Sequence, residues 1–516
     1  MNKTYTSLLK ACGLILLVFG TFGCGGSSSS TKAPAAPTLP NTPPAQAANI
    51  MQFGFYQTAN PSLSANVILE IEGTNIVGRV PDNINVNTLV ASFFHTGSEV
   101  KVNNLIQTSG QTANDFTQKQ QYTVTSSDGS SRQYTVDLTR FTGLPVVYLN
   151  TDGNVSITSK DDYINGQILI TGTRDYLSLP AVDMEIRGRG NSTWQHPKKP
   201  YQMKLTDKSE ILGMPSDKKW LFIAEYSDKT MLRNKIAFEL GYMSKLSWTP
   251  KSEFAEVYLN DDYIGTYHIT EKVEEGDSRV VLADVGYLLE IDQLERLDSD
   301  DVYFNTARFL INIKEPEVNW ASAELAEVSA IINEFESALF ASNFKDQTSG
   351  YSAYIDLDSF IDWYLISEIT KNVDSRSWSS IYLNVIPGKK IKMGPLWDFD
   401  LSFGNVDYAD SQYPEGFWIK EHQWYQRLFQ DPAFVTKVQE RFVFFKENQA
   451  TIIGMIDEYA NRLKWAQQEN DNRWQTLGIY VWPNPVVFDT HQQEVDYLKN
   501  WLNVRMQWLE EALNAL

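Results

Sequence analysis

Cysteine is almost absent from this chain, which has two cysteines in 516 residues. Cys12 lies inside the apolar N-terminal run, and Cys24 follows that run directly. Downstream of Cys24 there are therefore neither disulfide bonds nor thiolate metal sites. The histidines are also few, and none has the spacing of a zinc-binding pair. They are His95, His196, His268, His422 and His491.

An excess of basic residues is missing as well. The chain has 64 acidic and 44 basic residues, and its formal net charge is -20 at pH 7. Proteins that bind nucleic acid normally have the opposite balance, because they neutralise phosphates with Lys and Arg. We therefore expect no nucleic-acid partner. At this length two or more domains are expected.

The N-terminal apolar run is too short to cross a bilayer. Lys3 and Lys10 precede an apolar stretch over residues 11–23, shorter than the ~20 residues that a spanning helix needs. This pattern predicts a signal peptide over residues 1–23. The sequence Thr-Phe-Gly-Cys that ends at Cys24 resembles a bacterial lipobox, although Thr21 replaces the usual leucine. We expect Cys24 to be acylated and to anchor the chain in the cell envelope, at the outer membrane or cell surface; cleavage by an ordinary signal peptidase is the alternative.

Two segments follow the signal. Residues 24–48 are rich in Ser and then in Pro, a composition that cannot form a core, and we interpret them as a lipidated tether. Over residues 49–141 short β-like runs alternate with turn residues, and Ser127–Ser130 is typical of a hairpin turn. This region resembles the immunoglobulin-like modules of bacterial surface proteins. It predicts an all-β sandwich that serves as a spacer or a binding module.

The sequence over residues 142–516 predicts an α+β domain with a helical C-terminal part. The first half of this domain contains a basic segment. Gly188 and Gly190 in this segment would let the backbone approach a phosphate. In the alternating run that ends at Leu205, Gln202 and Lys204 share one face, so Lys204 is expected to project into a cleft. A solvated basic hairpin is the alternative. The five cations of the segment are Arg187, Arg189, Lys198, Lys199 and Lys204.

The stretch Gly394–Asn405 sets two carboxylates, Asp398 and Asp400, into an aromatic and aliphatic run. If the stretch is extended, both carboxylates lie on one face, opposite Trp397 and Phe399. Two like charges so close together need a cation, and a hard ion such as Mg2+ suits them. The alternative is a polar turn whose charges are in water. The apolar neighbours favour the metal, because a buried carboxylate must be paired or metal-bound.

Three further carboxylates are candidates for the same site. A helix is expected from Asp228, its N-cap, to Leu240, and Glu239 near its end is a candidate to pair with a cleft lysine. Glu271 ends a hairpin that turns at Asn260 and Asp261. Asp374 lies in a polar loop after an apolar helix that includes residues 360–369, one hairpin upstream of Asp398.

Several of these stretches, in this order, resemble the CotH kinase family across residues 145–516. They are I-R-G-R-G-N-S-T-W, P-K-K-P-Y-Q-M-K-L, D-K-T-M-L-R-N-K, V-Y-L-N-D-D-Y-I-G-T-Y-H-I-T-E and G-P-L-W-D-F-D-L-S-F-G. The resemblance implies an atypical protein-kinase-like fold without the usual kinase signatures. It also implies a secreted kinase that uses ATP with Mg2+ or Mn2+ to phosphorylate Ser or Thr of a surface protein.

The resemblance further implies roles for particular residues. Asp374 resembles the catalytic-loop aspartate and Asp398 the metal ligand, with Asp400 as a second metal candidate. Lys204 or Lys199 would hold phosphate, and the remaining candidates for the cofactor site are Arg187, Arg189, Glu239 and Glu271. A spore-coat role does not carry over, because the tether and the N-terminal module suit a cell-surface protein. Two other interpretations stay open: an inactive surface scaffold or adhesin with the same fold, and a carbohydrate-binding lipoprotein.

Overall fold

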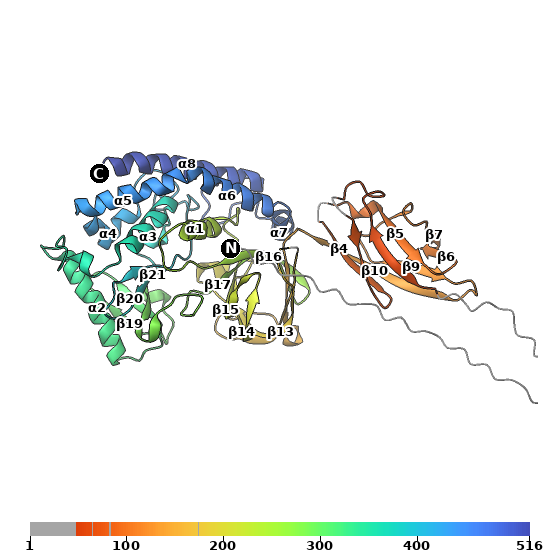
Figure 1. Cartoon of the computed structure of the whole chain (residues 1–516), viewed down its shortest axis with the longest axis horizontal. Coiled ribbons are helices and arrows are strands. Elements are labelled where there is room, and N and C mark those ends of the chain that lie inside the picture. The colour runs from red at the N-terminus through yellow and green to blue at the C-terminus, as the bar shows by residue number, and fades with distance from the viewer. Residues whose placement is uncertain (1–47, 64–65, 82–83, 174) are drawn as a thin grey trace, which may run out of the picture.

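The computed structural model describes residues 48–516 except residues 64–65, 82–83 and 174 (Figure 1). The predicted signal peptide, Cys24 and nearly all of the predicted tether lie outside the described residues and stay predictions. Within the described part, no helix combines the length and the apolar character that a membrane crossing requires.

The N-terminal module consists of two sheets that share one hydrophobic core (Figure 1). The core is built by inward-facing aromatic side chains such as Phe53, Phe93 and Tyr122. The hairpin turn predicted before Ser131 is confirmed, with Gly129 at φ +83°. One sheet has the order β2 (Val67–Ile68), β1 (Ile50–Phe55), β5 (Leu89–His95), β8 (Ala113–Asn114). The other has the order β3 (Glu70–Glu72), β4 (Asn75–Pro81), β10 (Ser131–Phe141), β9 (Gln120–Thr125), β6 (Glu99–Val102), β7 (Leu105–Ile106).

The next seven strands close into a barrel. Alternate residues of each strand point inward, so that Ile186, Met203 and Trp220 are fully buried in one cluster. The predicted hairpin turn is confirmed at Asn260 and Asp261, both at positive φ. In barrel order the strands are β11 (Val146–Thr151), β12 (Ile164–Thr171), β13 (Leu179–Gly188), β14 (Tyr201–Ile211), β15 (Met214–Ile223), β17 (Asp262–Glu271), β16 (Ser252–Leu259).

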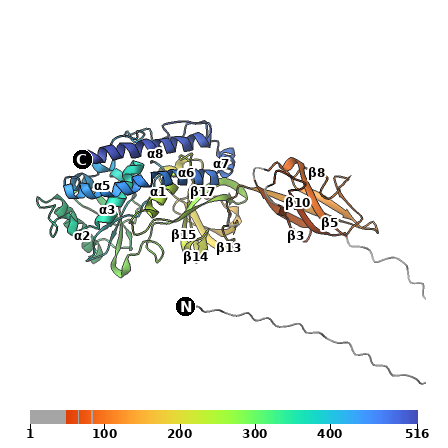
Figure 2. The same cartoon turned by 45° about the horizontal axis from the view of Figure 1, so that its top comes forward.

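A five-stranded sheet and the helices share the largest core cluster. The sheet order is β19 (Tyr303–Asn305), β20 (Leu310–Glu315), β18 (Tyr287–Asp292), β21 (Ile381–Val385), β22 (Lys392–Met393). Figures 1 and 2 both show the last helix, α8, running along α5 and α6. The helices are α1 (Arg233–Tyr242), α2 (Ala323–Phe340), α3 (Leu357–Thr370), α4 (Gln423–Leu428), α5 (Pro432–Glu447), α6 (Gln449–Arg462), α7 (Ala466–Trp474) and α8 (His491–Asn514).

Helix α1 begins later than predicted. The sequence placed the N-cap at Asp228, but the first helical residue is Arg233. The Asp228 carboxylate instead accepts hydrogen bonds from the backbone N–H groups of Thr230 and Arg233, at 3.0 and 2.8 Å. Met231 has φ +59°, a backbone conformation that a helix cannot contain. The Asp228 side chain therefore stabilises a turn ahead of the helix.

His422 couples the stability of the helical part to pH. Its ring is fully buried against Phe309, at 4.7 Å between centroids, and burial lowers its pKa to about 3 from the usual 6.5. Below pH 6.5 the unfolded chain therefore binds a proton that the folded chain does not bind. We expect His422 to reduce the free energy of unfolding by up to about 1.4 kcal/mol per pH unit as the pH falls from 6.5 toward 3.

The check is denaturant unfolding of the wild type and of His422→Asn between pH 7 and pH 5. Asparagine can replace the Nδ1 atom that accepts from the Trp424 backbone N–H at the start of α4. The variant should lose less stability over this pH range than the wild type. Equal slopes would contradict the assignment.

Candidate functional site

Two hydrogen bonds to backbone carbonyls bring the Asp374 loop and the Asp398 segment together. Helix α3 ends at Thr370, its C-cap Lys371 adopts φ +47°, and the chain turns toward residues 398–403. The N–H of Phe403 donates to the Thr370 carbonyl at 2.6 Å, and the Asn372 side-chain amide donates to the Asp398 carbonyl at 2.9 Å. Asp374 is therefore held beside Asp398, although the two are 24 positions apart in the sequence.

The Asp398 segment does not form a strand, the condition under which alternation would place both carboxylates on one face. No strand covers residues 394–400, and Asp398 has φ +65°. Trp397 and Phe399 are buried as expected, while Asp398 and Asp400 remain partly exposed and line the same cleft. The two carboxylates thus share one cavity through a turn rather than through the pleat of a strand. A non-glycine residue at positive φ is costly, and such residues cluster at functional sites.

Asp374, Asp398 and Asp400 line a polar cleft of about 380 Å3. Burial, reinforced by the neighbouring charge of Asp398, raises the pKa of Asp374 to about 6, and Arg296 opposes this shift. Burial also raises the pKa of Asp400, with further contributions from Asp398 and Asp374. The repulsion between these carboxylates marks a place where a cation is favourable.

Arg189 is a cation that lines the cleft together with Asp398 and Asp400. It follows β13 in a loop that turns at Gly190, which has φ +85°, and its guanidinium lies over the Trp397 ring at 5.6 Å. Burial lowers its pKa, and the charges of Asp398 and Asp400 oppose this change. Arg189 therefore has the charge and the position to contact an anion beside the two aspartates.

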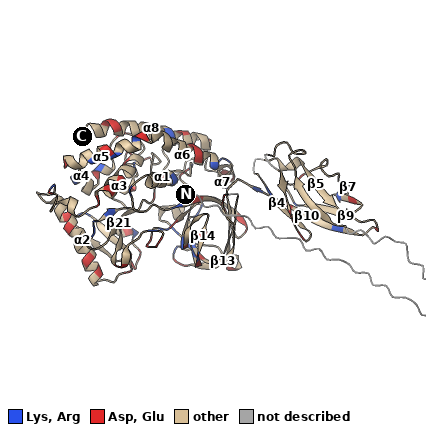
Figure 3. Ribbon diagram, in the orientation of Figure 1, with Lys and Arg blue, Asp and Glu red and all other residues tan. Residues whose placement is uncertain are grey.

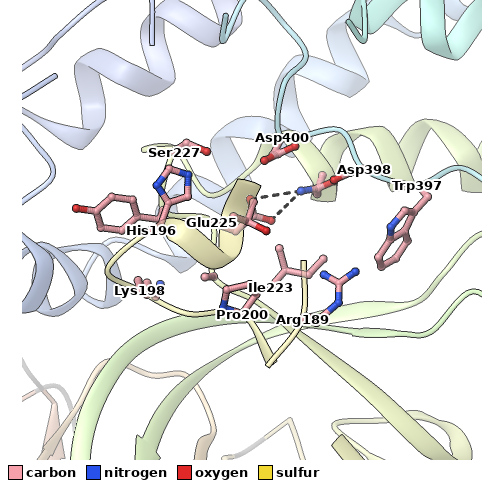
Figure 4. Close-up of a pocket in the computed structure, with 14 residues that line it drawn as sticks. Arg189, His196, Lys198, Pro200, Ile223, Glu225, Ser227, Trp397, Asp398 and Asp400 are labelled. Atoms are coloured by element: carbon pink, nitrogen blue, oxygen red, sulfur yellow. Dashed lines mark hydrogen bonds between the residues drawn. The ribbon is translucent and has the colours of Figure 1, made fainter. Parts of the chain in front are cut away.

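A smaller cavity of about 40 Å3 adjoins the cleft (Figure 4). Arg189 and Trp397 lie on one side of it, and His196 and Lys198 on the other. Lys198 is buried, and its amine donates to the Thr266 carbonyl and to Asn470 Oδ1, the latter at 2.8 Å. Burial lowers its pKa to about 7, against the charges of Glu225 and Glu256.

Asn234 links this cavity to the aspartates. Its side-chain amide donates to Glu225 at 3.1 Å, and its oxygen accepts from the Phe399 N–H at 2.7 Å. Burial raises the pKa of Glu225, and the charges of Asp228 and Asp400 add to the shift. Glu225 was not predicted as a site residue from the sequence, and Lys198 was predicted only as one of the cations of the basic segment. The signal for Lys198 was its place in the Lys-Lys pair before Pro200.

The structure brings only some of the other predicted residues to this site. Arg187 lines the cleft, and its guanidinium lies over the Tyr163 ring at 4.9 Å. Lys204, predicted to project into the cleft, is exposed and lies 3.5 Å from Glu185. Gln202, on the same strand face, lines the cleft instead. The prediction for Lys204 failed because alternation gives the face of a strand, not the distance along it to a cavity.

Three more predicted cofactor residues lie outside the cleft and the smaller cavity. Lys199 donates to the Trp194 carbonyl at 2.7 Å. Glu239 accepts from Tyr459 at 2.6 Å and lies 3.3 Å from Lys235 on α1. The buried Glu271 carboxylate accepts from the Lys251 N–H at 2.8 Å. Each of these three side chains therefore contacts other residues of the fold and does not line the site.

Asp398 and Asp400 fit a hard divalent cation that takes its other ligands from water or from phosphate. Within the described residues no three His, Cys, Asp or Glu side chains are grouped to hold a metal. Mg2+ commonly binds through one or two carboxylates and takes phosphate and water oxygens as its other ligands. The shared lining of one cleft by Asp398 and Asp400 is the observation that supports such an ion here.

Two family models match parts of the chain. The family model "CotH kinase protein" matches residues 186–509, and "SGBP, N-terminal" matches residues 58–138. No curated protein is significantly similar to the chain.

Two solved structures are similar to parts of the chain. One, from Bacteroides fragilis NCTC 9343 and provisionally described as a secreted protein, has 18% identity, covers 18% of this chain and 94% of its own, and has a TM-score of 0.14. The other, from Bacteroides thetaiotaomicron VPI-5482 and provisionally described as a glycoside hydrolase, has 15% identity, covers 57% and 89%, and has a TM-score of 0.16. Neither TM-score is high enough to imply a shared fold. The match to the CotH kinase protein model spans more than half of the chain, and it includes Asp374, Asp398 and Asp400 of the cleft. The chain therefore belongs to the CotH kinase protein family.

Proposed function

We propose that residues 142–516 are an atypical protein kinase that transfers the γ-phosphate of ATP to a Ser or Thr hydroxyl of a surface or extracellular protein. The observation that carries the proposal is the convergence of Asp374, Asp398, Asp400 and Arg189 on one cleft from three separate segments. A kinase site needs a proton acceptor, oxygen ligands for a metal, and a cation for phosphate, and these residues can supply all three.

Asp374 is the residue that would accept the acceptor hydroxyl's proton. The hydroxyl oxygen attacks the γ-phosphorus, the bond to the bridging oxygen breaks, and ADP leaves. With a pKa raised to about 6 by burial, Asp374 is mostly ionised at neutral pH yet close to the range that favours proton transfer. Ser380, whose hydroxyl lies 3.4 Å from Asp398 Oδ2, helps to orient the neighbouring carboxylate.

Arg187 and Arg189 would contact the phosphate oxygens of ATP. Arginine presents several N–H donors in a planar fork that matches phosphate, and Arg189 is already oriented by the Trp397 ring. Asp398 and Asp400 would hold Mg2+ or Mn2+, which supplies positive charge to the phosphate oxygens when bound. The buried amine of Lys198, whose pKa burial lowers to about 7, lines the smaller cavity together with Glu225 and is partly protonated at neutral pH.

The proposal also covers the two parts of the kinase domain on either side of the cleft, the N-terminal module and the lipid anchor. The barrel and the helical part on either side of the cleft would act as the two lobes of a kinase-like fold, and the two-sheet module over residues 49–141 would be an immunoglobulin-like spacer or binding module. A lipid anchor on Cys24 would hold the protein at the cell surface. These proposals rest on the sequence patterns and on the sheet order.

The test is incubation of purified residues 49–516 with γ-labelled ATP and Mg2+ or Mn2+, beside Asp398→Ala. Label should enter the protein or an added Ser- and Thr-containing substrate only with metal, and the variant should lose this label. Absence of both label and metal-dependent ATP binding by calorimetry would favour the inactive surface scaffold. Binding of glycans by residues 49–141 alone would favour a carbohydrate-binding role for that module.

A further inference from the structure

A further cavity lies outside the cleft and the smaller cavity and shares no lining residue with either. Its volume is about 420 Å3, and it opens beside the hairpin of β21 and β22. Much of its wall is apolar, and one wall residue, Val281, is 67% exposed. The apolar wall consists of Trp248, Val280, Val281, Ile386, Met393 and Pro395. This wall can accept an apolar side chain from a partner.

Three lysines surround the apolar wall: Lys389, Lys390 and Lys392. Lys390 donates to the Ser352 carbonyl at 2.8 Å, and Lys392 to the Ser247 hydroxyl at 3.0 Å. Throughout the described residues no carboxylate forms an ion pair with any of the three, and Lys389 and Lys390 are exposed. The lysines therefore retain their charge for a partner.

The lining of the cavity keeps an excess of positive charge. Asp356 is the one carboxylate among its lining residues, against three lysines, and it accepts from the Ser359 N–H at 2.9 Å as the N-cap of α3. Figure 3 shows acidic residues along α2 and α8, in a chain with a net charge of -20. The cavity is therefore a basic site on an acidic protein, and it will attract an acidic partner.

We propose that this cavity is a docking site for an acidic peptide segment that carries an apolar side chain. The apolar side chain enters between Trp248 and Met393, and flanking Asp or Glu residues pair with the lysines. A small anion would leave the apolar wall unused, so a peptide fits both features. If the proposed kinase function holds, the segment belongs to the phosphoacceptor protein, and only this last identification rests on that function.

The position of the cavity suits a partner that also reaches the cleft. Gly394 and Pro395 in its wall directly precede the segment that carries Trp397 and Asp398. The Gly394 carbonyl is held by the Asn384 side-chain amide at 2.8 Å. A docked segment would therefore contact the chain two residues before Trp397, which lines the cleft.

Fluorescence anisotropy with labelled peptides tests the proposal. The probes are a repeat of Glu-Glu-Leu, a repeat of Glu-Glu-Ser that lacks the apolar side chain, and a repeat of Lys-Lys-Leu. The purified protein should bind the first at least about tenfold more tightly than the other two. The double variant Lys389→Glu/Lys392→Glu should lose at least about tenfold in affinity for it, because two attractive charges become repulsive.

Two control variants, Lys437→Glu and Asp374→Asn, separate docking from folding and from catalysis, and Val281→Ser tests the apolar wall. Lys437→Glu changes an exposed lysine on α5, away from the cavity, and should bind like the wild type. Val281→Ser should weaken binding without any change in charge. Asp374→Asn should bind the Glu-Glu-Leu probe normally, so a failed kinase assay would not affect this result. Equal binding of the Glu-Glu-Leu and Glu-Glu-Ser probes, or unchanged binding by the Lys389→Glu/Lys392→Glu protein, would overturn the proposal.

Discussion

Replacing Asp374 by asparagine is expected to lower the rate of phosphate transfer by about 10²–10⁴-fold and to leave ATP binding nearly unchanged. Asparagine keeps the size of the side chain but cannot accept the proton of the acceptor hydroxyl. The proposed phosphate contacts, Arg187 and Arg189, remain in place. Transfer of label from γ-labelled ATP measures the rate, and calorimetry with ATP and Mg2+ measures binding.

Variants of Asp398 and Asp284 are the comparisons for the Asp374→Asn protein. Asp398→Asn should lose metal-dependent ATP binding as well as transfer, because it removes a metal ligand. Asp284→Asn alters an exposed aspartate that lines neither the cleft nor the smaller cavity, and should behave like the wild type. Wild-type transfer by the Asp374→Asn protein would show that another group accepts the proton, and would remove Asp374 from the mechanism.

The Arg505→Met substitution is expected to lower the free energy of unfolding by about 3–5 kcal/mol. Arg505 on α8 is fully buried, and its guanidinium donates to Glu368 Oε1 at 2.6 Å. It also donates to the carbonyls of Pro414 and Gly416, each at 2.7 Å. Methionine fills similar space but leaves the Glu368 carboxylate and both carbonyls without these donors. Chemical denaturation monitored by circular dichroism measures the loss.

A double variant tests whether the cost comes from the unpaired charge. Glu368→Gln/Arg505→Met removes both charges, so its loss of stability should be smaller than the sum of the two single losses. The glutamine side chain would still offer an oxygen to the N–H groups of Trp418 and Lys420, which now donate to Glu368 at 2.7 and 2.9 Å. A loss below about 1 kcal/mol for Arg505→Met would contradict the assignment of this pair as a main link between α3 and α8.

Local patterns predicted many elements correctly. The apolar helix predicted to include residues 360–369 corresponds to α3, which is buried over most of its length. The Asn260-Asp261 turn was predictable because these residue types tolerate positive φ. Asp398 and Asp400 were recognised because carboxylates rarely occur among residues as apolar as Trp397 and Phe399. Each of these patterns covers only a few neighbouring residues, so it can be recognised in the sequence without knowledge of any tertiary contact.

Which residues line the cleft is decided by contacts between distant segments of the chain. Strand alternation placed Gln202 and Lys204 on one face, but only the closed barrel determines that Gln202 lines the cleft while Lys204 meets Glu185. The loop at Gly190 carries Arg189 to Trp397, a contact that no local spacing encodes.

By itself, then, the sequence determined the order of the parts, the acidic character of the chain and the aspartates at its centre. The tertiary structure decided which cations meet those aspartates and how strongly burial raises the pKa of Asp374. The physical reason is that residue type and periodicity act locally. Burial and charge proximity depend on segments such as residues 187–189, 370–374 and 397–403, which become neighbours only when the chain folds.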